Sequence, residues 1–127
     1  MYNEKVFSIL KEMKNMGRIK HANGIGKEKS VYGDLIEIFL HIGESGIIEN
    51  ASFKAFGSPY VIAATSILVD LIKDKTIQDV FHITELDLNR EFGEIDSSRF
   101  YVFELVITCL SKAVKNYYVK QEKKESK

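Results

Sequence analysis

The amino-acid sequence predicts an α+β fold in which helices pack on one face of a small antiparallel sheet. Two runs that alternate apolar and polar residues, at 34–42 and 47–56, are separated by a short turn cluster at 43–46, which is typical of a β-hairpin. Helical periodicity precedes the two runs and follows them, and no internal repeat or linker divides the chain. Helices that are segregated from strands along the chain indicate the α+β class.

The length and composition are those of an ordinary globular domain. The chain has 127 residues, of which 45% are hydrophobic and 28% are charged, so we expect one domain at residues 1–120 and a charged flexible tail at 121–127. Lys+Arg and Asp+Glu both number 18, a balance that gives no global field for nucleic acid. No apolar run approaches the roughly 18–20 residues of a membrane span, and none resembles a signal peptide. We therefore expect a cytoplasmic protein with no nucleic-acid or membrane partner.

The first helix is expected over Asn3 to Met16, with Asn3 as its cap and Gly17 at its end. Its apolar residues recur at helical spacing and form one stripe: Val6, Ile9, Leu10, Met13 and Met16. The stretch from His21 to Ser30 is rich in glycine and lysine and predicts a loop, with room for a short first strand. Its Gly24-Ile25-Gly26 fragment lacks the rest of a phosphate-binding loop.

The hairpin strands follow, at Asp34 to Ile42 and Ile47 to Phe56. In the first strand the apolar face alternates with Glu37 and His41, as expected of a strand with one face on a core: Ile36, Ile38, Leu40 and Ile42. In the second strand Ile47, Ala51, Phe53 and Ala55 face opposite Asn50, Ser52 and Lys54.

A helix is predicted directly after the hairpin, from Pro59 to about Lys73. Ser58 is a good N-cap, and Pro59 suits the first helical position. Thr76 is expected to cap a short helix that runs through Val80.

Two more helices complete the predicted fold. Thr84 with Asp87 is a variant of the capping box and opens a helix that ends at Gly93. The residues 96–98, Asp-Ser-Ser, are expected to cap the last helix, Arg99 to about Val119.

An ordered set of fragments carries a family resemblance over about residues 1–120. The fragments are Tyr2 to Val6, Asn15 to Gly17, Tyr32 to Leu35, Gly46 to Ser58, Ile62 to Ser66, Lys73 to Ile77 and Ala113 to Tyr117. In this order the chain resembles the NifU/IscU family of iron–sulfur cluster assembly scaffolds. The resemblance implies a small antiparallel sheet with helices on one side, which agrees with the reading of the elements above.

The resemblance also implies a cluster site built from three cysteines, often joined by a histidine or an aspartate. The first cysteine belongs to a Cys-Gly-Asp motif, and its position falls on Tyr32 while Asp34 keeps the aspartate. The second follows Phe-Gly and falls on Ser58. The third belongs to a His-Cys pair, which falls on Tyr101 and Val102 when residues are counted back from the matching C-terminal helix.

The loss of the three thiols changes the chemistry that the sequence predicts. Thiolates bind iron strongly, whereas serine and tyrosine hydroxyls are protonated near neutral pH and bind it far more weakly. The single cysteine, Cys109, lies at none of the family positions. We therefore predict no bound cofactor, neither cluster nor zinc, and no enzymatic activity. The predicted function is a protein-interaction or regulatory module, with a partner such as the cysteine desulfurase or another assembly protein.

Two alternative functions remain open from the sequence. The chain could bind iron or zinc weakly, with Asp34 as the candidate ligand, and deliver it within cluster assembly. It could also be a repurposed small-molecule binding module with an aromatic pocket at Tyr32, Ser58 and Tyr101.

Several residues have a structural reading beside the functional one. Asp34 is either a metal ligand or a solvated residue at a strand start, and Ser58 is either a nucleophile or an N-cap. Cys109 is either a core residue or a redirected sulfur acceptor. Tyr32 and Tyr101 either fill the former cluster site or form an exposed patch for a partner. The three histidines lack the spacing of a metal site: His21, His41 and His82.

Overall fold

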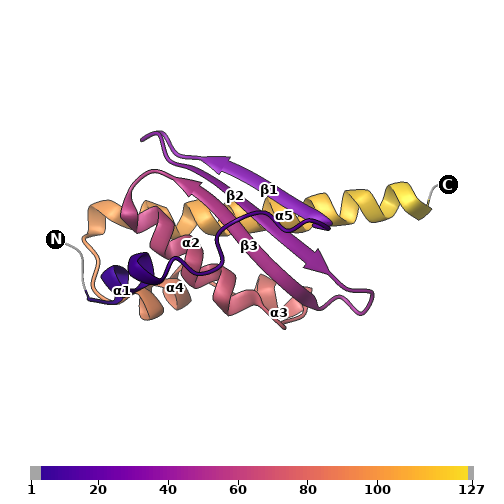
Figure 1. Cartoon of the computed structure of the whole chain (residues 1–127), viewed down its shortest axis with the longest axis horizontal. Coiled ribbons are helices and arrows are strands. Elements are labelled where there is room, and N and C mark those ends of the chain that lie inside the picture. Colours follow the sequence, from indigo (N-terminus) through magenta and orange to yellow (C-terminus); the bar gives the residue numbers. More distant parts are fainter. Residues whose placement is uncertain (1–3, 126–127) are drawn as a thin grey trace.

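The computed structural model describes residues 4–125 as a three-stranded sheet with helices packed on one face and an extended connection on the other (Figure 1). The expected cap Asn3 and the last residues of the expected tail, 126–127, lie outside the described residues. The elements, in order, are α1 (Glu4–Glu12), β1 (Gly24–Lys29), β2 (Leu35–Ile42), β3 (Ile48–Phe56), α2 (Pro59–Ile72), α3 (Ile77–Phe81), α4 (Glu85–Phe92), a 3₁₀ turn (Ser97–Arg99) and α5 (Tyr101–Glu125). The predicted α+β class is confirmed.

The sheet has the order β1-β2-β3 with antiparallel neighbours, so the predicted hairpin is β2–β3. Leu35 pairs with Phe56 at one end of the hairpin, and His41 pairs with Asn50 near the other. The predicted apolar side of β2 faces α2 and α5 and is buried, with Ile38 and Leu40 at 0% exposure. Alternation along a half-buried strand therefore oriented the sheet correctly.

The glycine-rich stretch contains the edge strand β1, which packs closely on α5. A methyl group on Gly26 would overlap the carbonyl oxygen of Cys109, and one on Gly24 would lie 2.7 Å from the carbonyl oxygen of Ala113. The Ile25 N–H on the free edge donates to Oδ1 of Asn116 on α5, at 2.9 Å. These glycines therefore permit a close helix–strand contact, which explains the fragment without a phosphate.

The predicted helix starts are confirmed after the hairpin. Ser58 caps α2 by accepting from the Val61 N–H, and Pro59 is the first helical residue. Thr76 and Thr84 each form a reciprocal capping box with the aspartate three residues on. Local hydrogen bonding between a short polar side chain and the first turn decides such starts, so they can be read from sequence.

The first and last helices differ from the expected ranges. Helix α1 ends at Glu12 instead of Met16, because residues beyond it pair with the edge of β3: the Phe53 N–H donates to the Asn15 carbonyl, and the Gly17 N–H donates to the Phe53 carbonyl. Met13 and Asn15 adopt positive φ there. A tertiary strand contact thus replaced the last helical turn.

Helix α5 begins at Tyr101 instead of Arg99, after the 3₁₀ turn, and the Asp96 side chain makes no capping hydrogen bond. It continues past Val119 to Glu125, so residues 121–125, expected in a flexible tail, are helical. Lys, Gln and Glu are good helix formers, and a polar helix end needs no core contact to continue. The division of the chain at residue 120 stays a prediction. No helix among residues 4–125 has both the length and the apolar character needed to cross a membrane.

Candidate functional site

Four of the five predicted positions meet at one end of the sheet. Tyr32 and Asp34 lie in the β1–β2 turn, and Ser58 lies where β3 passes into α2. The pairing of Leu35 with Phe56 brings these two connections together. Tyr101, at the first residue of α5, completes the group from the helical side.

The Asp34 carboxylate is the centre of the site. Asp34 is buried, with 3% of its surface exposed. Its carboxylate accepts three hydrogen bonds: Oδ1 from the Ser58 N–H at 3.0 Å, and Oδ2 from the Ser30 and Tyr101 hydroxyls at 2.7 Å each. The carboxylate thus ties the β1–β2 turn to the start of α2 and to α5. A buried carboxylate needs such donors, because an unpaired charge there is costly.

A glycine makes this arrangement possible. Gly57 has a φ of +143°, and a methyl group at that position would overlap Oδ1 of Asp34. The close approach lets the following N–H, that of Ser58, reach the carboxylate. The Phe56-Gly57-Ser58 fragment therefore has a structural reason independent of any thiol.

The hydrogen bonds set the ionisation of both partners. Burial pushes the pKa of Asp34 upward, but the donors Ser58, Ser30 and Tyr101 and the nearby Arg99 charge outweigh it, so the pKa lies below the ordinary aspartate value. Burial, and then the hydrogen bond and charge of Asp34, raise the pKa of Tyr101 to about 12. At neutral pH the site therefore holds a carboxylate and a protonated phenol.

The site opens to solvent through an aromatic rim. The rings of Tyr32 and Tyr101 are in contact, with centroids 4.6 Å apart, yet Tyr32 is 71% exposed and Phe56 is 72% exposed. These residues and Arg99 line a surface cavity of about 570 Å³ together with Gly33, Asp34, Gly57, Ser58 and Ser98. Tyr32 therefore does not fill a core.

Val102 is the predicted position that the structure places elsewhere. Its exposure is 0%, and it packs within the hydrophobic core, while its neighbour Tyr101 faces the cavity. Successive residues of an α-helix point about 100° apart, so one turn cannot present both side chains to the same site.

Arg99 is the site residue that sequence reasoning missed. It lines the cavity, and its guanidinium carbon lies 4.6 Å from the centroid of the Tyr60 ring, in the range of a cation–π contact. Nothing in its local sequence distinguishes it from other exposed arginines, and only the turn before α5 brings it here.

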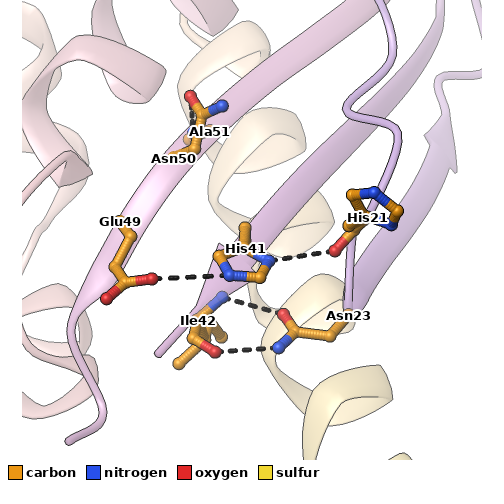
Figure 2. A network of polar contacts seen from close by, with 7 residues as sticks. All are labelled: His21, Asn23, His41, Ile42, Glu49, Asn50 and Ala51. Carbon is orange, nitrogen blue, oxygen red and sulfur yellow. Dashed lines mark hydrogen bonds and ion pairs between the residues drawn. The ribbon is translucent and has the colours of Figure 1, made fainter. Parts of the chain in front are cut away.

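Neither Cys109 nor the histidines add a metal site. Cys109 has 0% exposure, and its Sγ lies 3.4 Å from the Gly26 carbonyl oxygen; burial above all raises the pKa of this thiol to about 12. His41 lies between the His21 carbonyl oxygen and the Glu49 carboxylate (Figure 2). Over residues 4–125 no group of three or more His, Cys, Asp and Glu side chains is arranged to hold a metal ion.

The fold and the site together define a small scaffold-like α+β domain with a cavity at the end of its sheet. The family model described as the NifU-like N terminal domain matches residues 1–124. The chain therefore belongs to the NifU/IscU family, as the resemblance of its fragments indicated, and it is related to iron–sulfur cluster assembly scaffolds.

Individual relatives agree with this assignment. The iron-sulfur cluster assembly scaffold protein IscU of Aquifex aeolicus is 32% identical over 126 residues, which cover 98% of this chain and 80% of the relative. The iron-sulfur cluster assembly scaffold protein IscU 1 of Archaeoglobus fulgidus is 30% identical over 124 residues, which cover 97% of this chain and 80% of the relative. The crystal structure of a putative scaffold protein for the SUF system from Fervidobacterium islandicum has the same fold, with a TM-score of 0.73 at 19% identity over 88% of this chain and 95% of that one.

Proposed function

We propose that this chain is a family member that holds no cluster by the three-cysteine mechanism and works as a protein-interaction module in iron–sulfur cluster assembly. The observation that carries the proposal is the composition of the site: two phenols, a serine hydroxyl and a carboxylate that already accepts three hydrogen bonds. We propose no catalytic role. The cytoplasmic location and the lack of nucleic-acid partners stay predictions from the sequence.

The donor set supports the loss of the cluster. Protonated hydroxyls are poor ligands for iron in a cluster, and the Tyr101 phenol, with a pKa of about 12, resists the deprotonation that would improve it. Three of the roughly four acceptor positions of the Asp34 carboxylate are already occupied by internal donors, so a metal ion would compete with them. This also disfavours the alternative in which Asp34 carries iron or zinc.

The first experiment tests cluster binding directly. The protein purified without oxygen and reconstituted with iron and sulfide should hold less than about a tenth of an equivalent of iron and show no thiolate-to-iron absorption band. A variant with Tyr32→Cys, Ser58→Cys and Tyr101→Cys should gain both, because these three positions line one cavity. Tyr32→Ser with Tyr101→Ser, which adds no thiol, is the matched control. Iron and sulfide near one cluster per wild-type chain would contradict the proposal.

An exposed apolar surface beside the site supports the interaction role. Leu35 and Phe56 are cross-strand neighbours, 52% and 72% exposed, and Tyr32 continues them around the rim. We call Tyr32, Leu35 and Phe56 the aromatic patch. Large exposed apolar side chains that adjoin one another are typical of protein contact sites, where tyrosine and phenylalanine are enriched.

The second experiment tests the partner. The cysteine desulfurase of the same organism is the first candidate, since the family resemblance implies it. Titration should give a dissociation constant well below about 50 μM. Tyr32→Ala with Phe56→Ala should weaken binding by about tenfold or more. Phe81→Ala on α3, which is 61% exposed and outside the patch, is the control and should leave binding unchanged. Absence of binding at that concentration would contradict this choice of partner.

A further inference from the structure

The connection between α1 and β1 forms a strap, residues 13–23, across the sheet face opposite α2 and α5 (Figure 1). It first pairs with the edge of β3 through Phe53 and then crosses β2, where the Arg18 guanidinium carbon lies 5.8 Å from the centroid of the Phe39 ring. It reaches β1 through Asn23, whose side chain donates to the Ile42 carbonyl and accepts from the Ile42 N–H (Figure 2). The strap is therefore fixed to the edge strand β3 at its start and to the central strand β2 at its end, where the chain enters β1.

A cationic cleft lies along the strap. Its volume is about 560 Å³, and five of its lining residues are basic: Arg18, Lys20, His21, His41 and Lys73. None of its lining residues within the described chain is an Asp or a Glu. Two carboxylates touch cleft residues from outside, Glu49 at His41 and Asp70 at Asn15. We call this surface the strap cleft.

The permanent charges of the strap cleft have no anionic partner within residues 4–125. The basic side chains that form ion pairs within residues 4–125 are Lys14, Lys27, His41, Arg90 and Lys112. Arg18, Lys20 and Lys73 are not among them. Lys73 donates to the amide oxygen of Asn15, a neutral acceptor. Like charges that lie close together without counter-charges lower the stability of a fold. The local excess of positive charge at the cleft therefore says more about its function than the net charge of the chain does.

A segment of opposite charge lies elsewhere in the chain. Residues 77–96, which form α3, α4 and the segment after them, carry one arginine, Arg90, one histidine, His82, and no lysine, against six acidic side chains: Asp79, Glu85, Asp87, Glu91, Glu94 and Asp96. The strap, in contrast, carries Lys14, Arg18 and Lys20 and no acidic side chain, so these two segments have opposite net charge. An incoming molecule meets a positive field at the strap and a negative one along α3 and α4.

We propose that the strap cleft docks a carboxylate-rich peptide segment of a partner protein. Charge complementarity selects an anion, and the size of the cleft suits several side chains instead of one small ion. A nucleic acid fits less well, because no Phe, Tyr or Trp lines the cleft for base stacking. The cleft is separate from the aromatic patch, so this inference holds whichever partner binds there.

The test is a titration with a fluorescent peptide of about ten residues rich in Glu and Asp, against the same peptide with Gln and Asn. The acidic peptide should bind at least about tenfold more tightly, with an affinity that falls as salt rises. Arg18→Glu with Lys20→Glu and Lys73→Glu should weaken binding by about tenfold or more. Lys115→Glu with Lys123→Glu and Lys124→Glu on α5, which changes the net charge equally, should change it by less than about threefold.

Two further measurements keep the test decisive. Because Arg18 covers Phe39, the milder pair Lys20→Gln and Lys73→Gln should also weaken binding while the thermal midpoint stays unchanged. An equal loss in both triple variants would overturn the proposal, since it would show attraction by net charge alone. It would also be overturned by tighter binding of a single-stranded oligonucleotide, or by self-association in sedimentation that the cleft variant abolishes.

Discussion

Helix α5 contacts the sheet region at two points, and the ionisable groups Asp34 and Cys109 at these two contacts have pKa values shifted in opposite directions. At its first turn Tyr101 meets Asp34 at the edge of an open cavity, where three donors keep the carboxylate charged. Farther along, Cys109 meets the Gly26 carbonyl in a closed contact, and burial raises the pKa of the thiol to about 12. At Asp34 the hydrogen-bond donors outweigh the effect of burial on the pKa, whereas at Cys109 burial outweighs the one backbone hydrogen bond, from Ile38, that favours the thiolate. The one cysteine, Cys109, is therefore buried away from the candidate site, and no cysteine lines the cavity of that site.

The largest expected effect concerns the reactivity of Cys109. At pH 8 the folded protein should react with a disulfide reagent about a thousandfold more slowly than the protein unfolded in urea, because a pKa of about 12 leaves little thiolate. Absorbance of the released thiol measures the rate. Comparable rates in the folded and unfolded protein would mean that the contact with β1 opens readily and would break the comparison.

Gly26→Ala should cost about 3 kcal/mol of unfolding free energy, since the new methyl would overlap the backbone of α5 at Cys109. Urea denaturation at neutral pH measures the loss. Gly33→Ala is the control: its φ is +94° but nothing lies within 4 Å of the added methyl, so about 1 kcal/mol is expected from backbone strain alone. Equal losses would show that the close contact is not what constrains Gly26.

Asp34→Ala should destabilise the fold by about 2 kcal/mol, because it leaves the Ser58 N–H and two hydroxyls without their acceptor. Asp70→Ala, which removes only an exposed acceptor of Asn15, should cost less than about 0.5 kcal/mol. Chemical denaturation of the two variants side by side checks the difference. If Asp34→Ala left the free energy of unfolding unchanged, the site would not be held by this carboxylate.

The lowered pKa of Asp34 also predicts a pH dependence. The folded protein binds the Asp34 proton less readily than the unfolded chain does, so its contribution to stability is full above about pH 4 and is lost as pH falls through the folded pKa. Glu28 and Asp87, whose pKa values are also lowered, contribute to the same acid loss. The free energy of unfolding should therefore fall less in Asp34→Asn than in the wild type between pH 5 and 3, with a difference of about 1 kcal/mol or less. The decline should become shallower but should not disappear.

A similarly small effect is expected for Tyr101→Phe, at about 1 kcal/mol, because Asp34 keeps its other two donors. Tyr118→Phe, on an exposed ring of the same helix, should be neutral. An ultraviolet titration adds a readout specific to the site: Tyr101→Phe should remove the phenol that ionises at about pH 12. An unchanged titration curve would show that Tyr101 is not the phenol held by the carboxylate.

Sequence reasoning succeeded where a few neighbouring residues decide the structure. The caps at Ser58, Thr76 and Thr84 and the alternation in β2 are local signals, and each is confirmed. It failed where a distant contact intervened: the strap ends α1 early by pairing with Phe53, and α5 begins after an unforeseen 3₁₀ turn. The shared site of Tyr32, Asp34, Ser58 and Tyr101 came from the family resemblance, and no local pattern joins residues so far apart.

The sequence by itself determined the class of fold, the family and the presence of a single cysteine, because these depend on residue identity, order and local periodicity. Only the tertiary structure decided how the candidate site is arranged. Hydrogen bonding assigned Asp34 to holding three segments together, helix geometry turned Tyr101 to the cavity and Val102 to the core, and chain crossing gathered the strap cations into one cleft. Each depends on distances between residues remote in the chain, which composition and spacing do not specify.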